Sequence, residues 1–366
     1  MIYINKVLSL LFINTLAVSF LNFTLNNLFN NYILVSMNKA FLENIFALAG
    51  NSQIFIVGDV MLDRYLFGDV NRISPEAPVQ VFDIKKSENR LGGAANVAFN
   101  ISALGSVPFL IGVTGNDRES ELLKEQLSSL GVSTVGLINE DKRPTTSKTR
   151  VISDAHHLIR IDSESKEDIS EASENKLVEL LEHNANTGDV VILQDYNKGV
   201  LTKDVIYKIN NVAKMKDLRV LVDPKFENFF EYKDVYLFKP NRKELEDAMG
   251  KKVKDHNHID TLAEEVMDRI KCENIILTLG EHGMMILEKS NGNVTKEIIG
   301  TKARKVADVS GAGDTVISTI AVCLAGGSSL RDAAVISNYA AGLVVEEVGI
   351  VPVYKEALIA NISGGI

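Results

Sequence analysis

Residues 53–62 read QIFIVGDVML, an apolar run that closes on Gly58 and Asp59. A short run of this kind is typical of a parallel strand that is buried on both faces and ends at a site. Similar runs recur along the chain, and several finish on Asp, Lys or Gly: Val107–Gly112, Val190–Asp195, Arg219–Asp223, Tyr236–Lys239 and Ile275–Gly280.

Helical patterns separate these runs, at Glu119–Leu130, Ser170–His183, Asp204–Met215 and Ile259–Lys271. Because strand and helix alternate, the sequence predicts an α/β fold with a doubly wound, mostly parallel sheet flanked by helices. Such sheets bind ligands beyond the carboxyl ends of their strands, so we expect the site there.

Two segments interrupt the alternation, because they are rich in β-forming and turn residues and lack helical periodicity. They fall within about residues 64–90 and 145–162. We expect them to form a small β-sheet that acts as a lid and closes over the site to exclude water. Apolar positions such as Val79 and Ile84 in so small a sheet need a partner surface, which predicts a homodimer formed through the lid.

The composition is that of an ordinary globular protein, with 46% hydrophobic and 24% charged residues in a chain of 366. The formal net charge of -9 argues against a nucleic-acid binder, which needs fields of Lys and Arg. The two cysteines, Cys272 and Cys323, have no metal-ligand spacing and make a disulfide framework improbable. A reducing, cytoplasmic location therefore fits the sequence.

Residues 1–36 differ from the rest of the chain, because Lys6 is their only charged side chain. They can be interpreted as a signal peptide, although polar residues interrupt its apolar stretch. They can also be interpreted as a membrane anchor, although the run Asn22–Asn31 would bury polar amides in lipid. The interpretation that we favour is a start at Met37, so that one domain spans residues 37–366 and no membrane partner is expected.

Residues 308–314 read DVSGAGD and are followed by an apolar helical pattern. The small residues Gly311, Ala312 and Gly313 let backbone amides converge at a helix N-terminus, where the helix dipole adds about half a positive charge. Such an anion hole would stabilise negative charge on a transferring phosphoryl group, and Asp314 beside it would take a proton from an attacking hydroxyl. The alternative is a tight turn in which Asp merely favours a helix start.

Residues 91–98 read LGGAANVA, a second stretch of small residues that opens a helix. Gly92 and Gly93 permit the close approach of a ligand, and the amide of Asn96 offers a donor and an acceptor to a sugar. The same small residues could instead allow a helix to pack closely on the sheet. Neither stretch is a GxxxxGK[ST] loop or a GxGxxG dinucleotide fingerprint, and the absence of the GxxxxGK[ST] loop excludes a P-loop kinase.

Together, the two stretches resemble the signatures of the PfkB, or ribokinase-like, family of sugar kinases, in the same order and with roughly the same separation. The resemblance covers residues 53 to about 355 and departs at Val309 and Ser310, where the second signature usually carries Thr. It implies a ribokinase-like fold with a β lid. It also implies a phosphotransferase that moves the γ-phosphoryl group of ATP, with Mg²⁺, to a sugar hydroxyl, with Asp314 as the catalytic base.

The resemblance also implies the remaining site residues. Asp63 matches a first-strand motif whose aspartate binds sugar hydroxyls, and residues 241–244 match an N-x-x-E motif that helps to hold nucleotide phosphates and, through water on Glu244, magnesium. The N-x-x-E pattern is equally that of a helix capping box. The expected sugar-binding residues are Asp63, Gly92, Gly93, Asn96, Arg160 and Lys198, and the expected ATP-binding residues are Lys225, Asn241, Arg242, Lys243, Glu244, Thr278, Gly280 and Gly283. Lys225 is expected from its place after the strand that ends at Asp223, where it could reach a phosphate, and the alternative is a surface lysine.

Three stretches resemble one branch of the family, the kinases of D-glycero-β-D-manno-heptose 7-phosphate, at residues 58–65, 68–79 and 194–199. Such enzymes, alone or as the kinase domain of a bifunctional protein, phosphorylate O1 on the way to ADP-heptose for the lipopolysaccharide core. The resemblance implies a small-molecule sugar phosphate as substrate, and its phosphate needs cations, for which Arg72, Arg160 and Lys198 are candidates. The alternatives are another kinase of this family, of the ribose, fructose or tagatose-phosphate type, or a catalytically silent sugar-binding regulator.

Overall fold

The structure, a computed structural model, describes residues 37–364 apart from 155, 254–257, 291, 304 and 348. The interpretations of residues 1–36 concern a segment outside the described residues. In the described part of the chain, no helix is both long enough and apolar enough to cross a membrane. Cys272 and Cys323 are free and buried.

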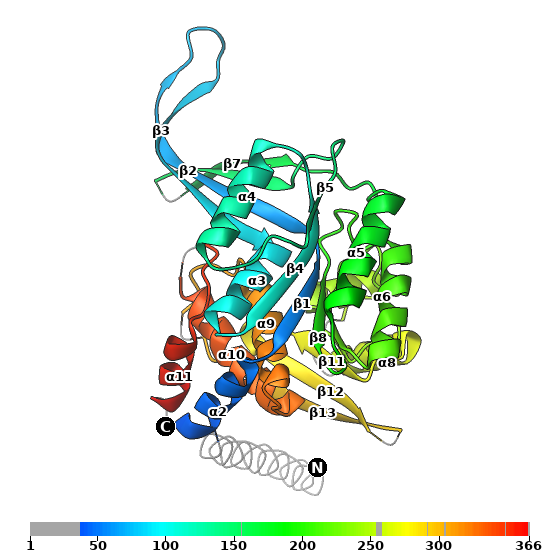
Figure 1. Cartoon of the computed structure of the whole chain (residues 1–366). Coiled ribbons are helices and arrows are strands. Elements are labelled where there is room, and N and C mark those ends of the chain that lie inside the picture. Colours follow the sequence, from blue (N-terminus) through cyan, green and yellow to red (C-terminus); the bar gives the residue numbers. More distant parts are fainter. Residues whose placement is uncertain are drawn as a thin grey trace, which may run out of the picture.

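A mostly parallel sheet runs through the centre of the molecule, as the alternating pattern predicts (Figure 1). Its described strands lie in the order β13 (Asn293–Ile299), β12 (Met284–Ser290), β11 (Asn274–Thr278), β10 (Leu237–Phe238), β9 (Arg219–Asp223), β8 (Val190–Gln194), β1 (Gln53–Gly58), β4 (Val107–Thr114) and β5 (Leu137–Asn139). Neighbouring strands from β11 to β5 pair parallel, whereas β12 and β13 add an antiparallel edge.

The chain reverses its direction of winding at β1. From β1 it winds outward to β4 and β5, then crosses back to β8 on the other side of β1 and continues to β9, β10 and β11. In open α/β sheets, ligands bind beyond the carboxyl ends of the strands at such a switch point. The ends of β1 and β8, at Gly58 and Gln194, therefore mark the expected site.

Helices cover both faces of the sheet (Figure 1). Successive residues of β1 point to opposite faces, so Ile54 and Ile56 belong to one core and Phe55 and Val57 to the other. The first core includes α2 (Lys39–Ala49), α3 (Ala94–Ala103), α4 (Arg118–Ser129), α9 (Ala312–Ala325), α10 (Leu330–Val345) and α11 (Lys355–Ser363), and the second includes α5 (Glu171–Asn184), α6 (Lys203–Lys216), α7 (Arg242–Met249) and α8 (Ile259–Ile270).

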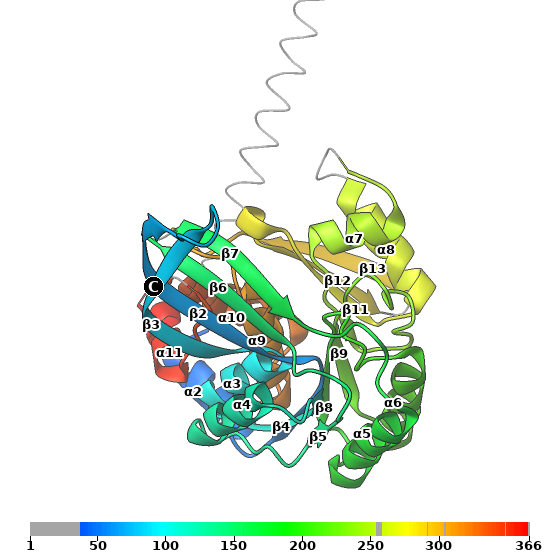
Figure 2. The ribbon, with the colours of Figure 1, turned by 90° about the horizontal axis from the view of Figure 1, so that it is seen from above.

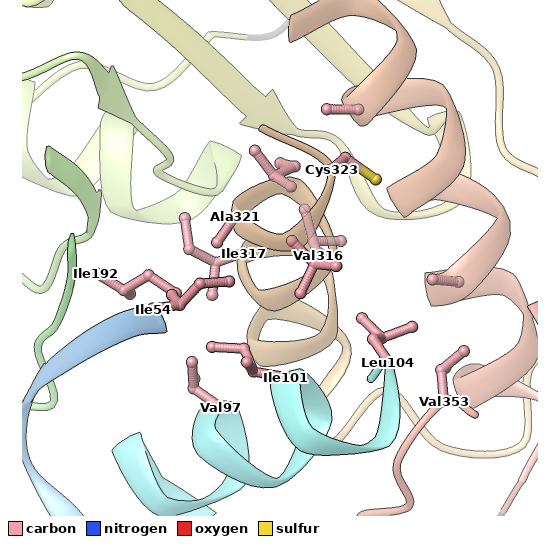
Figure 3. Packing of buried hydrophobic residues seen from close by; sticks show 14 of the residues in the cluster. Ile54, Val97, Ile101, Leu104, Ile192, Val316, Ile317, Ala321, Cys323 and Val353 are labelled. Carbon is pink, nitrogen blue, oxygen red and sulfur yellow. The ribbon is translucent and has the colours of Figure 1, made fainter. Parts of the chain in front are cut away.

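The helix α9 is buried along most of its length and belongs to the first core (Figure 3). Ile317 and Ala321 lie in one cluster with Ile54 of β1, Ile192 of β8 and Ile101 of α3. Burial of an aliphatic side chain contributes about 1.5–3 kcal/mol. The core therefore fixes α9, and with it the first turn of the helix, at the carboxyl ends of the strands.

The second sheet is small, and Figure 2 shows its strands side by side. They lie in the order β3 (Gln80–Gly93), β2 (Val60–Ile73), β6 (Ser147–Ser153) and β7 (His156–Ser163). β2 pairs antiparallel with β3 and parallel with β6, and β6 pairs antiparallel with β7. The β2–β3 hairpin projects from the body of the molecule (Figure 1). This is the small sheet that the sequence predicts, whereas its closure as a lid stays a prediction.

Candidate active site

The first turn of α9 presents backbone amides at a helix N-terminus. Gly311 caps the helix with a φ of 79°, a conformation that favours glycine. The amide of Ala312 donates to the carbonyl of Val309 (3.3 Å), but none of the described residues accepts a hydrogen bond from the amides of Gly313 or Asp314. These two amides, together with the positive end of the helix dipole, can therefore bind an anion.

Asp308, the first residue of the same signature, shapes this turn. Its Oδ1 accepts a hydrogen bond from the amide of Ser310 (2.9 Å) and its Oδ2 accepts one from the amide of Gly349 (3.0 Å). Burial alone would raise the pKa of Asp308, but these hydrogen bonds lower it. The ionised side chain thus holds the loop in place.

Asp314 is buried, with 3% of its surface exposed, and its carboxylate accepts three hydrogen bonds. Asn96 of α3 donates to Oδ2 (2.7 Å), while the hydroxyl of Tyr196 (2.7 Å) and the side-chain amide of Gln194 (3.1 Å) donate to Oδ1. Burial raises the pKa of Asp314 to about 6, with a further contribution from Asp223 and against the effect of the Asn96 hydrogen bond. Such a carboxylate is ionised at neutral pH and is a stronger base than an exposed aspartate.

The sequence does not single out Tyr196 or Gln194 as site residues. A signal was available, because both stand at the end of the apolar run of β8, where the fold class places ligands. Burial and the neighbouring Asp314 raise the pKa of Tyr196 well above its usual value. The hydroxyl therefore stays protonated and donates to the carboxylate.

Lys239 and Asp223 form a buried ion pair next to the anion hole. The ammonium nitrogen lies 3.1 Å from Oδ1 of Asp223, and 3% and 7% of the two side chains are exposed. A Cβ added to Gly313 would lie 3.6 Å from the same nitrogen, so the cation is adjacent to that available amide. Lys239, another residue that the sequence does not assign, adds positive potential where an anion would bind.

A cavity of about 850 Å³ opens beside Asp314. Every residue that the sequence assigns to ATP lines it, and so do Asp314 and the expected anion-hole residues 311–313. Ala341, Gly342 and Val345 of α10 add an apolar side. The cavity thus joins an apolar wall, basic side chains and a helix N-terminus, the combination that a nucleotide requires.

Asn241 and Glu244 form a capping box at the start of α7, which confirms that interpretation of the N-x-x-E pattern. Asn241 Oδ1 accepts from the amide of Glu244 (2.8 Å), and Glu244 Oε2 accepts from the amide of Asn241 (2.9 Å). The other oxygen of Glu244 pairs with Lys225. Burial would lower the pKa of Lys225, but Asp223 and Glu244 outweigh it and raise that pKa, so the lysine is charged.

The cavity offers Mg²⁺ carboxylates but no complete protein cage. In the part of the chain that the structure describes, no group of three or more His, Cys, Asp or Glu side chains is placed to hold a metal ion. Asp223 and Glu244 both line the cavity. Mg²⁺ commonly binds through one or two carboxylates, waters and substrate phosphates, so these residues fit the ion.

Asp63, Gly92 and Gly93 lie where the small sheet meets α3. The carboxylate of Asp63 on β2 pairs with Arg150 of β6, a residue that the sequence does not assign. A Cβ on Gly92 would overlap Oδ2 of Asp63, so the glycine leaves room for the carboxylate. Gly93 is the N-cap of α3, the helix that carries Asn96. These expected sugar-binding residues therefore lie next to the start of α3, whose Asn96 donates a hydrogen bond to Asp314.

Arg160 and Lys198 have other partners. Arg160 on β7, with 58% of its side chain exposed, pairs with Asp162 (2.9 Å). The ammonium of Lys198 pairs with Glu164 (2.8 Å). Neither residue lines the cavity beside Asp314 or contacts Asp314 within the described chain.

The family model described as pfkB family carbohydrate kinase matches residues 51–355. Among curated proteins, the chain is 40% identical over 317 residues to the Bifunctional protein HldE of Desulfatibacillum aliphaticivorans, which covers 87% of this chain and 64% of that protein. It is 40% identical over 302 residues to the protein of the same name from Aliarcobacter butzleri, which covers 82% of this chain and 62% of that protein. The chain therefore spans less than two thirds of the length of these relatives.

Solved structures share the fold at low sequence identity. Phosphofructokinase-2 from Escherichia coli in complex with potassium superposes with a TM-score of 0.71 at 18% identity, covering 85% of this chain and 99% of that chain. Arabidopsis thaliana ribokinase complexed with ribose and ATP superposes with a TM-score of 0.67 at 19% identity, and the superposition covers 85% of this chain and 98% of that chain.

Proposed function

The chain belongs to the pfkB family of carbohydrate kinases, and we propose that it transfers the γ-phosphoryl group of ATP to O1 of D-glycero-β-D-manno-heptose 7-phosphate. The observation that carries the proposal is the position of Asp314. Its side chain lines the cavity and accepts a hydrogen bond from Asn96, which lies in the first turn of α3, directly after strand β3 of the small sheet. The resemblance of residues 58–65, 68–79 and 194–199 to heptose 7-phosphate kinases and the likeness to the curated relatives support this branch of the family.

In the proposed reaction, Asp314 accepts the proton of the O1 hydroxyl as that oxygen attacks the γ-phosphorus. The bond from this phosphorus to the bridging oxygen of ATP breaks, and ADP leaves. The amides of Gly313 and Asp314 and the ammonium of Lys239 offset the negative charge on the transferring group. No covalent enzyme intermediate is needed, because positioning and charge stabilisation supply the catalysis.

ATP is proposed to occupy the cavity beside Asp314, with its triphosphate toward the N-terminus of α9. Lys225 is proposed as a phosphate ligand, because it lines the cavity and its raised pKa keeps it charged. Mg²⁺ would be held by Glu244 through water, with Asp223 nearby, and would offset charge on the β- and γ-phosphates.

The sugar is proposed to bind under the small sheet, against Asp63 and Asn96, and closure of this sheet would exclude water. Its 7-phosphate needs cations. Arg150 and Arg160 stand directly opposite each other on β6 and β7, so their side chains share a face of the sheet. Arg160 is exposed, and its ion pair with Asp162 at the surface is weak, so we keep Arg160 as a proposed phosphate ligand. We add Arg150 because it lies on the same face of the sheet. Lys198 is a weaker candidate because only 11% of its side chain is exposed and its ammonium is paired with Glu164.

We also propose that two copies associate through the small sheet. Ile159 and Ile161 of β7 expose 57% and 54% of their surface, and Val79 and Ile84 of the β2–β3 hairpin expose 57% and 58%. Light scattering at micromolar concentration is expected to give the mass of a dimer, and Ile159→Lys is expected to shift it toward that of a monomer. A strict monomer for the unmodified chain would contradict the proposal.

Coupled ATP turnover across a panel of sugars tests the proposed function. The panel contains the heptose 7-phosphate, the unphosphorylated heptose, ribose, fructose, fructose 6-phosphate and tagatose 6-phosphate. We expect kcat/KM for the heptose 7-phosphate to exceed that for the free heptose by about a hundredfold or more, because cations built for a phosphate are left unpaired without it. Phosphorus NMR of the product should report an anomeric phosphate. Equal kcat/KM for the two heptoses would refute the substrate, and no turnover of any sugar would favour a silent regulator.

A further inference from the structure

Asp59 lies between β1 and β2 at the switch point of the sheet, and 1% of its surface is exposed. Its Oδ2 accepts hydrogen bonds from the amides of Tyr196 (2.7 Å) and Lys198 (3.1 Å), and its Oδ1 accepts one from the amide of Val200 (3.2 Å). One buried carboxylate thus binds three amides of the loop that follows β8.

The backbone of Asp59 contacts two further segments. Its amide donates to the carbonyl of Gln194 at the end of β8 (3.1 Å), and its carbonyl accepts from the amide of Ala94 at the start of α3 (2.9 Å). The side chain and the backbone of one residue therefore join the end of β8, the following loop and the first turn of α3.

Those three segments carry the three side chains that donate to Asp314. Gln194 ends β8, Tyr196 lies in the loop, and Asn96 lies in the first turn of α3. We infer that Asp59 is a positioning residue of the proposed phosphoryl transfer, and that its carboxylate holds the loop so that the Tyr196 hydroxyl reaches the proposed base. The inference rests on the proposed function.

The ionised carboxylate suits this position better than a neutral amide would. Three converging N–H groups need acceptor lone pairs, which a carboxylate supplies on both oxygens. In Asp59→Asn, one oxygen becomes an NH₂ group that points at N–H donors, so at least one amide of the loop loses its partner. The backbone contacts to Gln194 and Ala94 do not involve the side chain, so the substitution leaves these hydrogen-bonding groups in place.

The experiment compares Asp59→Asn with Asp117→Asn in the full chain. Asp117 is a matched control: its carboxylate accepts from the amides of Ser120 (2.9 Å) and Thr145 (2.7 Å), and it does not contact Asp314. We expect Asp59→Asn to lower kcat by about 10- to 100-fold, the effect of misplacing a catalytic contact, with the KM for ATP little changed. Asp117→Asn should keep the kcat of the unmodified chain. Asp59→Asn at unmodified kcat would overturn the inference.

A double-mutant cycle with Tyr196→Phe separates positioning from general destabilisation. If the carboxylate acts through the Tyr196 hydroxyl, Asp59→Asn should reduce kcat far less once that hydroxyl is absent. Multiplicative effects of the two substitutions would overturn the inference. Should Asp59→Asn not fold, Asp59→Ser carries the same test, because its hydroxyl oxygen keeps one acceptor without an opposing NH₂ group.

Amide hydrogen exchange tests the inference without any substrate. The amides of Tyr196, Lys198 and Val200 should exchange faster in Asp59→Asn and at the unmodified rate in Asp117→Asn. Unchanged exchange in Asp59→Asn would overturn the inference. Failure of the proposed function has a different signature, because the unmodified chain would then turn over none of the sugars.

Discussion

The side-chain amide of Asn96 donates a 2.7 Å hydrogen bond to Oδ2 of Asp314, joining residues 218 positions apart in the sequence. Asn96 belongs to the first glycine-rich stretch and Asp314 to the second. Asn100 in turn donates to Oδ1 of Asn96 (3.2 Å), which fixes the orientation of the amide. The two motifs are therefore parts of one buried hydrogen-bond network around the proposed base.

This contact predicts the pH dependence of an Asn96→Ala variant. The pKa of Asp314 is raised to about 6, so a reaction that needs its ionised form loses rate as the pH falls through about 6. The Asn96 hydrogen bond lowers that pKa. Removing it should move the acid limb of log kcat/KM to higher pH, and an acid limb at its original position would show that the amide does not tune the base.

A Gly92→Ala variant should lose sugar binding and keep ATP binding. The new methyl group would overlap Oδ2 of Asp63 and displace the carboxylate from Arg150. We expect the KM for the sugar to rise by at least about tenfold, the effect of losing one charged hydrogen bond. Gly300→Ala is the control, because a Cβ there has no heavy atom within 4 Å. Steady-state kinetics with each substrate varied would check this, and a larger effect on ATP than on the sugar would contradict it.

Glu244→Gln separates the capping role of the side chain from its proposed role toward Mg²⁺. Glutamine still completes a capping box, so α7 should keep its first turn. The loss of charge should raise the Mg²⁺ concentration needed for half-maximal rate. Glu244→Ala is the comparison, since it should in addition lose the hydrogen bond to the amide of Asn241, about 0.5–1.5 kcal/mol. An unchanged Mg²⁺ requirement in Glu244→Gln would leave the capping box and the ion pair with Lys225 as the roles of this residue.

The sequence predicts those parts of the site that depend on local pattern. The alternation of apolar runs predicts the sheet, and the small residues before Asp314 predict the helix start, because both follow from backbone geometry within a few residues. Gly92 and Asn96 are identified in the same way. The structure places Asn96 against the carboxylate of Asp314 and Gly92 against that of Asp63.

The residues that the sequence does not assign depend on contacts between distant segments. Tyr196 follows β8 and Lys239 follows β10, and no local pattern distinguishes either residue. Their side chains reach the site because parallel strands end at the same edge of the sheet. Arg150 reaches Asp63 because β6 pairs parallel with β2, a register that no local pattern encodes. Lys198 looks available in the sequence, yet its partner Glu164 lies 34 positions away.

Asp314→Asn is the decisive variant for the proposed mechanism. Asparagine keeps the size of the side chain but cannot accept the hydroxyl proton, and loss of a general base typically costs about 10²- to 10⁴-fold in rate. ATP binding should be retained, because the cavity wall and the amides of the first turn are unchanged.

The raised pKa of Asp314 also predicts how the stability of this variant depends on pH. The pKa of Asp314 is about 6 in the folded protein, above its usual value of 3.8. The protonated side chain therefore contributes to the free energy of unfolding below pH 3.8, and this contribution is lost as the pH rises through about 6. At pH 8 this loss is about 3 kcal/mol, and asparagine does not incur it. The thermal midpoint of Asp314→Asn relative to that of the unmodified chain should therefore rise between pH 5 and pH 8, while sugar phosphorylation is nearly abolished. Turnover within a few-fold of the unmodified chain would mean that Asp314 is not the base, whatever the midpoints show.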